Sequence, residues 1–312
     1  MERVLGIDIG GTSIKVGLFS PEGRLDAVSQ IPTGEIVSEA AFAVVTNGLK
    51  RLLAENGSSP EDVIAVGLDV PGPVDDDGKV GMLANIELDP EGLKAAILHE
   101  FSRANLAFVN DANAAALGEL WQGSAKGSKN FVLIAIGTGV GGGVVSGGKL
   151  ISGAFGAGGE LGHITVNRDE DVTCGCGRRG CLEQYASAKG IVNSYLRVCE
   201  ELGTEPVLLD GPTDTLSVFD AHRAGDKAAK KAIDIMCDYL GYAMAQVSVI
   251  VDPQAYLIGG GVGGGFNLYA EALRNSFRKY CLAPSAGARI LPASLGNDAA
   301  MYGCAFKALE ER

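Results

Sequence analysis

Three cysteines and one histidine have the residue types and spacing of a metal site. Cys174, Cys176 and Cys181 form the pattern Cys-x-Cys-x-x-x-x-Cys, and His163 lies eleven residues before the first of them. Three thiolates and one imidazole match a closed tetrahedral zinc site, which is structural rather than catalytic because protein atoms fill all four positions. The alternatives are a loop of buried thiols or a disulfide, and a disulfide is disfavoured because Cys-x-Cys closes a strained ring.

Two glycine loops could hold phosphate groups. The first is Asp8-Ile9-Gly10-Gly11-Thr12-Ser13-Ile14-Lys15. Glycines at a hairpin tip expose backbone N–H groups to phosphate oxygens, to which Thr12 adds a hydroxyl and Lys15 a positive charge. Asp8 could hold Mg²⁺ through water, since Mg²⁺ prefers oxygen ligands. An ordinary hairpin turn is the alternative.

The second loop, 137–143, contains Gly-x-Gly-x-x-Gly but continues into a strand-like run, so a dinucleotide site is disfavoured there. The glycines at 259–264 follow a strand and precede a helix, and we expect them to pack against the base and ribose of a nucleotide. No Walker-type motif is present, which excludes a P-loop enzyme.

Asp111 follows the strand-like run 106–110 and opens an alanine-rich helix. Its simplest role is a helix N-cap. However, the carboxyl end of a strand is where α/β proteins bind ligands, and an attacking hydroxyl needs a base. Glu160 and Glu183 flank the cysteine cluster. Each alone is typical of a solvated surface charge, but beside a rigid metal loop they become candidate acceptors for the hydroxyls of a polyol.

These residues must be positioned by two α/β halves. Strand-like runs at 4–9, 14–19, 63–70 and 106–110 alternate with helical spacing at 35–55, 91–103 and 111–122. The pattern restarts at 131–136 with a second glycine tip and a return strand at 144–145. It continues through mostly helical sequence to a strand at 255–258 and a last helix at 297–309. Alternating strands and helices indicate α/β layers, and we expect a cleft between the halves.

Composition excludes several classes of protein. The 312 residues are 46% hydrophobic and carry a net charge of -12, which disfavours binding to nucleic acid. There is neither a secretory signal nor an apolar run long enough to cross a membrane. Seven cysteines, an odd number, favour a reducing compartment, so we expect a cytoplasmic protein.

Together, these motifs resemble those of the ROK family of sugar kinases and repressors, most closely its bacterial glucokinases. The resemblance covers the whole chain and includes Pro71-Gly72-Pro73 and Gly159-Glu160-Leu161-Gly162-His163. It implies an actin-like, hexokinase-like (ribonuclease H-like) fold of two α/β domains. The last helix returns to the first domain in this family, so we expect a small domain at 1–112 and 297–312 and a large domain at 113–296.

The resemblance also implies roles for individual residues. Asp111 is the expected catalytic base. The residues expected to bind the sugar are Asn85, Asn110, Asp111, Glu160, His163 and Glu183. The residues that it places at the ATP phosphates are Gly10, Gly11, Thr12, Gly137, Thr138 and Gly139, with Gly261 near the adenosine. Asp8 and Lys15 join the expected phosphate site from the chemistry of the first loop. The segment Ile86-Glu87-Leu88-Asp89-Pro90 departs from the Gly-Trp that often follows the family asparagine, which puts Asn85 and the choice of hexose in doubt.

The expected activity is the ATP-dependent phosphorylation of a hexose, with glucose as the first choice and a homodimer as the assembly. An N-acetylhexosamine kinase or a fructokinase would use the same site. A sugar-responsive repressor is disfavoured, because repressors of this family carry an additional N-terminal helix-turn-helix, whereas this chain begins with the phosphate-loop strand.

Overall fold

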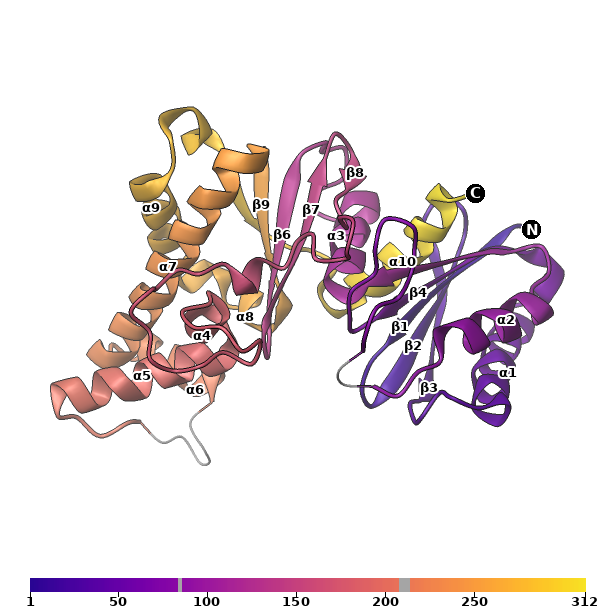
Figure 1. Cartoon of the computed structure of the whole chain (residues 1–312), viewed down its shortest axis with the longest axis horizontal. Helices are drawn as coiled ribbons and strands as arrows, with labels where there is room; N and C mark the ends of the chain where they lie inside the picture. The colour runs from indigo at the N-terminus through magenta and orange to yellow at the C-terminus, as the bar shows by residue number, and fades with distance from the viewer. Residues whose placement is uncertain (84–85, 208–213) are drawn as a thin grey trace.

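The computed structural model describes residues 1–83, 86–207 and 214–312 (Figure 1). Asn85, an expected sugar contact, lies outside the described residues. The described chain forms two five-stranded sheets, with the strand orders β3-β2-β1-β4-β5 and β10-β9-β6-β7-β8. The expected α/β architecture with two related halves is therefore confirmed.

The two sheets repeat one topology. In the first sheet, β1 (Arg3–Ile9) is antiparallel to β2 (Ser13–Phe19) and parallel to β4 (Val63–Val70). In the second, β6 (Phe131–Ile136) is antiparallel to β7 (Val140–Ser146) and parallel to β9 (Ala255–Gly259). Each sheet thus places a glycine tip between its first two strands. Both tips lie at the carboxyl end of a central strand, where α/β proteins bind ligands.

The outer strands complete the sheets. They are β3 (Leu25–Pro32) and β5 (Asn105–Asn110) in the first sheet, and β8 (Lys149–Leu150) and β10 (Arg289–Pro292) in the second. The sequence analysis did not predict β3, β8 or β10. Residues of β3 alternate between half-buried and exposed, and β8 and β10 have only two and four residues, so none forms the continuous apolar run of a buried strand.

Helices cover both faces of each sheet. Apolar residues of α1 (Glu39–Glu55) and α2 (Pro90–Glu100) pack on one face of the first sheet, and α10 (Ala299–Glu310) packs on the other. The second sheet is covered on one face by the long α7 (Lys227–Val251) and by α5 (Ala188–Leu202), and on the other by α3 (Asp111–Gln122). The remaining helices are α4 (Glu183–Ala186), α6 (Thr215–Arg223), α8 (Gly260–Gly263) and α9 (Ala270–Tyr280).

Helices α3 and α10 lie side by side between the two sheets (Figure 1). Their backbones touch: a Cβ atom at Gly303 would lie 1.6 Å from the carbonyl oxygen of Ala114, and one at Gly118 would lie 2.0 Å from that of Ala299. Only glycine permits so close an approach. The chain passes from the first sheet to the second through α3 and returns through the segment before α10. The contact between α3 and α10 therefore lies where the two connections between the sheets meet.

Candidate active site

A cavity of about 810 Å³ lies among the expected site residues. Nine of those residues line it: Asp8, Asn110, Asp111, Gly137, Thr138, Gly139, Glu160, His163 and Glu183. They come from both halves of the chain. The sequence analysis did not assign a role to Gly296 and Asn297, which also line the cavity and precede α10.

Asp111 is the first residue of α3, and its neighbour Asn110 is the N-cap. The Asn110 side chain accepts hydrogen bonds from the N–H groups of Ala112 and Asn113, both at 3.1 Å, and donates one to the carbonyl of Gly72 at 3.1 Å. The N-cap role considered for Asp111 is therefore taken by Asn110. As a result, the Asp111 carboxylate keeps an oxygen for the cavity, while Oδ1 accepts from the N–H of Ala112 at 2.8 Å.

Burial raises the pKa of the Asp111 carboxyl, although hydrogen bonds from Ala112 and Asn110 oppose the shift. A base works best when its pKa approaches the working pH, so this direction suits proton abstraction. Burial also raises the pKa of Glu160, with the His163 imidazole lowering it and the charges of Asp111 and Glu183 raising it further.

Asp8 interacts with a buried carboxylate of the first sheet, Asp69, to which the sequence analysis gave no role. Asp69, on β4, is fully buried and its Oδ1 accepts the N–H of Ile9 at 2.8 Å, whereas its Oδ2 has no partner among the described residues. Burial and then the charge of Asp8 raise the pKa of Asp69 well above its usual range. For Asp8, burial raises the pKa and the Lys15 ammonium opposes it.

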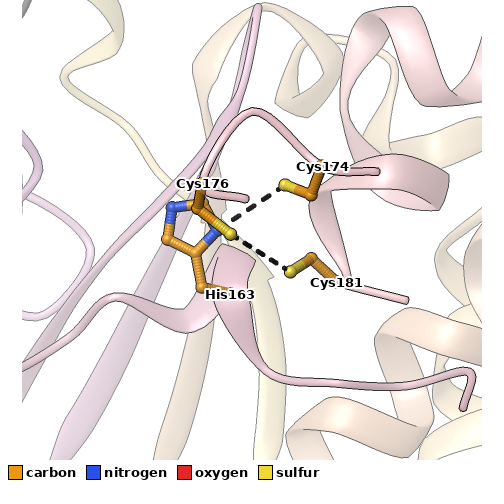
Figure 2. A group of neighbouring side chains, drawn as sticks. All are labelled: His163, Cys174, Cys176 and Cys181. Atoms are coloured by element: carbon orange, nitrogen blue, oxygen red, sulfur yellow. Dashed lines mark hydrogen bonds between the residues drawn. The ribbon is translucent and has the colours of Figure 1, made fainter. Parts of the chain in front are cut away.

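The metal-type cluster forms as expected (Figure 2). The ligand atoms of His163, Cys174, Cys176 and Cys181 all lie within 4.8 Å of one another. The sulfurs of Cys176 and Cys181 are 3.6 Å apart, and Nδ1 of His163 is 4.0 Å from Sγ of Cys174. Tetrahedral Zn²⁺ with bonds of about 2.3 Å to sulfur requires sulfur–sulfur separations of about 3.8 Å. The four side chains therefore fit zinc, and the sulfurs are too far apart for a disulfide.

Glu183 connects this cluster to the second glycine tip. Its Oε2 accepts the N–H of Val140 at 3.1 Å, and its Oε1 lies 3.7 Å from Sγ of Cys174. A Cβ atom at Gly139 would lie 2.4 Å from Oε2 of Glu183. Glycine at this position thus lets the carboxylate pack directly against the tip.

Other expected residues lie outside this cavity. Gly10, Gly11, Thr12 and Lys15 are not among its lining residues, and the exposed Gly11 and Thr12 stand at the tip of the first hairpin. Gly261 lies in α8, where its neighbour Gly260 reaches the cavity instead.

A second cavity, of about 580 Å³, borders the first at Thr138 and Glu183. It runs between the cysteine loop and α5, and two cationic side chains, Lys189 and Arg197, line it. Arg197 pairs with the buried Glu170 at 3.5 Å. The sequence analysis did not foresee this cavity, because much of the rest of its wall comes from α5 and from residues 170–173, which carry no motif.

Comparison with known proteins identifies the family. The profile of the ROK family matches residues 4–311. The chain belongs to the ROK family. A glucokinase of Halalkalibacterium halodurans is 36% identical over 96% of this chain and 92% of its own length. The crystal structure of a ROK family glucokinase from Streptomyces griseus in complex with glucose and AMPPNP superposes with a TM-score of 0.76, at 32% identity, over 99% of each chain.

Another relative is named for a different sugar. An N-acetyl-D-glucosamine kinase of Aliivibrio salmonicida is 28% identical over 96% of this chain and 98% of its own length. The family and the actin-like sugar kinase fold expected from the sequence are thus confirmed. In the described ranges, we find no helix with the length and apolarity needed to span a bilayer.

Proposed function

We propose that this ROK protein transfers the terminal phosphoryl group of ATP to a hexose, with glucose as its substrate and glucose 6-phosphate as the product. One observation carries the proposal: a single cavity is lined by the Asp111 carboxylate, by the side chains expected to bind the sugar (Glu160, His163 and Glu183), and by the Thr138 tip. The glucokinases among its relatives support the choice of sugar.

Asp111 is the base in this proposal. Its carboxylate accepts the proton of the sugar hydroxyl as that oxygen attacks the terminal phosphorus, and the nucleoside diphosphate leaves. Glu160, His163 and Glu183 accept and donate hydrogen bonds to the other hydroxyls. Asn110 fixes the start of α3, and Asn85 completes the expected sugar set.

The phosphates would lie between the two glycine tips, 10–12 and 137–139, with Gly261 near the adenosine. Asp8 would hold Mg²⁺ through water, and the ion would neutralise phosphate charge during transfer. Zn²⁺ held by His163, Cys174, Cys176 and Cys181 would fix the loop that presents His163 and Glu183.

Further parts of the proposal rest on the family and the composition. We propose a cytoplasmic homodimer that binds no nucleic acid, in keeping with the net charge of -12. The small domain would comprise residues 1–112 and 297–312, and the large domain residues 113–296, which assigns one sheet to each.

The test is a coupled ADP-release assay with glucose, mannose, fructose, N-acetylglucosamine and N-acetylmannosamine. We expect glucose to give the highest kcat/KM. A tenfold preference for an N-acetylated sugar or for fructose would replace the substrate and leave the kinase reaction standing. Absence of ADP release with every sugar, from folded protein supplied with Mg²⁺ and Zn²⁺, would refute the kinase.

A further inference from the structure

Glu119 is a fully buried carboxylate for which the proposed reaction has no use. It lies near the end of α3 and accepts four hydrogen bonds. Oε1 accepts the N–H groups of Ser294 and Leu295 at 2.8 and 2.7 Å, and Oε2 accepts the N–H of Ser124 at 2.7 Å and the hydroxyl of Ser294 at 3.1 Å. Its four lone-pair directions are therefore all used.

These bonds join two segments that are far apart in the sequence. Ser124 follows α3, while Ser294 and Leu295 lie in the return segment 293–298, between β10 and α10. A further bond from the Ser124 hydroxyl to the carbonyl of Pro292, at 3.0 Å, strengthens the same junction. Across the described ranges, no Lys, Arg or His pairs with Glu119. Only neutral donors thus stabilise the buried carboxylate. The positions of Ser124, Ser294 and Leu295 are therefore sensitive to any change of Glu119.

The return segment leads directly to a cation of the first phosphate hairpin. Lys15 Nζ donates to the carbonyl of Asn297 at 3.3 Å and forms an ion pair with Asp298. Lys15 also stands opposite Asp8 in the β1–β2 register, and its charge lowers the pKa of Asp8. Asn297 and Asp8 line the same cavity.

We infer that Glu119 is a positioning residue for the nucleotide phosphates. By fixing the backbone at Ser294 and Leu295, it places Asn297 and Asp298 so that they hold the Lys15 ammonium beside Asp8. In this inference Glu119 acts through the return segment and not by contact with a substrate, since its side chain is fully buried. The inference rests on the proposed function in one respect, the expectation that Lys15 faces the phosphates of ATP.

A purely structural Glu119 would behave differently. Loss of a buried, multiply bonded carboxylate lowers the free energy of unfolding in either case. A positioning role adds a selective effect on the nucleotide, because the path from Glu119 ends at the phosphate hairpin and not at the sugar residues. The decisive quantity is the KM for ATP compared with the KM for the sugar.

The first experiment uses the full-length protein and Glu119→Gln, which keeps the shape and one oxygen. We expect the KM for ATP to rise about tenfold while the KM for glucose stays within twofold.

Asn105→Ala is the matched control: Asn105 donates to the carbonyl of Ala308 at 2.5 Å, so its loss loosens the far end of α10 without touching the return segment. Thermal unfolding, followed by the fluorescence of the single Trp121, reports the stability of both variants. Equal changes in the two KM values, or a control that matches Glu119→Gln, would overturn the inference.

The second experiment is a double-mutant cycle with Asp298→Asn. If Glu119 acts through the return segment, Glu119→Gln adds less than about twofold to the KM for ATP once Asp298 is neutralised. If the increases in the KM for ATP caused by Glu119→Gln and Asp298→Asn instead multiply in the double variant, the inference is overturned. Should Glu119→Gln not fold, Ser294→Ala takes its place in the cycle, since it removes a single hydroxyl bond. The Kd for MgADP, measured by calorimetry, compares the same variants without turnover. Failure of the kinase reaction and failure of this inference therefore remain distinguishable.

Discussion

Nδ1 of His163 lies 4.0 Å from Sγ of Cys174, while the same residue lines the cavity that contains Asp111. One imidazole therefore belongs both to the metal-type cluster and to the wall of the proposed sugar site. Glu183 makes a parallel link, since its carboxylate lies beside Cys174 and accepts the N–H of Val140. We therefore expect the geometry of the proposed sugar site to depend on the conformation of the cysteine loop.

Removal of the metal is expected to weaken sugar binding as well as the fold. Elemental analysis should find about one zinc per chain, and Cys176→Ser should lower both the zinc content and the melting temperature, because a structural metal contributes folding free energy. The KM for glucose should rise more than the KM for ATP, since His163 and Glu183 lose their support. Zinc-free protein with full stability and an unchanged KM for glucose would contradict this prediction.

Asp111→Asn tests the base. Asparagine keeps the size of the side chain but cannot accept the proton, so we expect kcat to fall roughly a hundred- to ten-thousand-fold, with glucose binding changed far less. Asn110 is the helix cap, so the melting temperature should remain close to that of the wild type. Asp234→Asn, at an exposed ion pair on α7, is the control and should be fully active. Turnover of Asp111→Asn within threefold of the wild type would refute the assignment.

The pH dependence of turnover should show the raised pKa of Asp111. A base must be ionised to act, so kcat/KM should fall as the pH drops through that pKa, at a higher pH than for an ordinary aspartate. The measurement is kcat/KM for glucose between pH 5 and 8. This fall of kcat/KM at low pH should be absent from the residual activity of Asp111→Asn. If it persists in that variant, it must come from another group, such as Glu160.

Asp69 should make stability depend on pH. Its pKa in the folded state is raised, so the folded state binds the proton more tightly than the unfolded state. The contribution of Asp69 is greatest below its ordinary pKa and is lost as the pH rises through the raised value. Asp69→Asn keeps an oxygen for the N–H of Ile9 and cannot titrate. Urea unfolding from pH 5 to 8 should therefore show a shallower loss of stability in the variant. Parallel curves would show that Asp69 does not titrate in this range.

Much of the site could be predicted because its chemistry lies in short motifs. The cysteine spacing, the glycine tips and the carboxylate after a strand each predict a ligand type from local sequence alone, and the structure brings His163 of the metal-type cluster, the second glycine tip and Asp111 to one cavity. Asp69 and Glu119 could not be predicted in this way. Asp69 stands inside an apolar strand and accepts from Ile9, 60 residues away, and Glu119 stands inside a helix and accepts from Ser294 and Leu295, 175 and 176 residues away. The continuous apolar runs predicted the central strands, whereas β3 and β10 gain their place only by pairing with neighbours.

The cover of the first sheet by α10 also has a consequence for how the protein is made. Val4, Phe19, Ile64 and Ala107 pack against Met301, Ala305 and Ala308, so a face built from residues 4–107 is closed by residues that leave the ribosome only after position 300. Until those residues emerge, that sheet carries an open apolar surface, and the nascent chain needs shielding there. The second sheet lies wholly within residues 131–292 and can complete its strands earlier. The half that is translated first is therefore the half that finishes folding last.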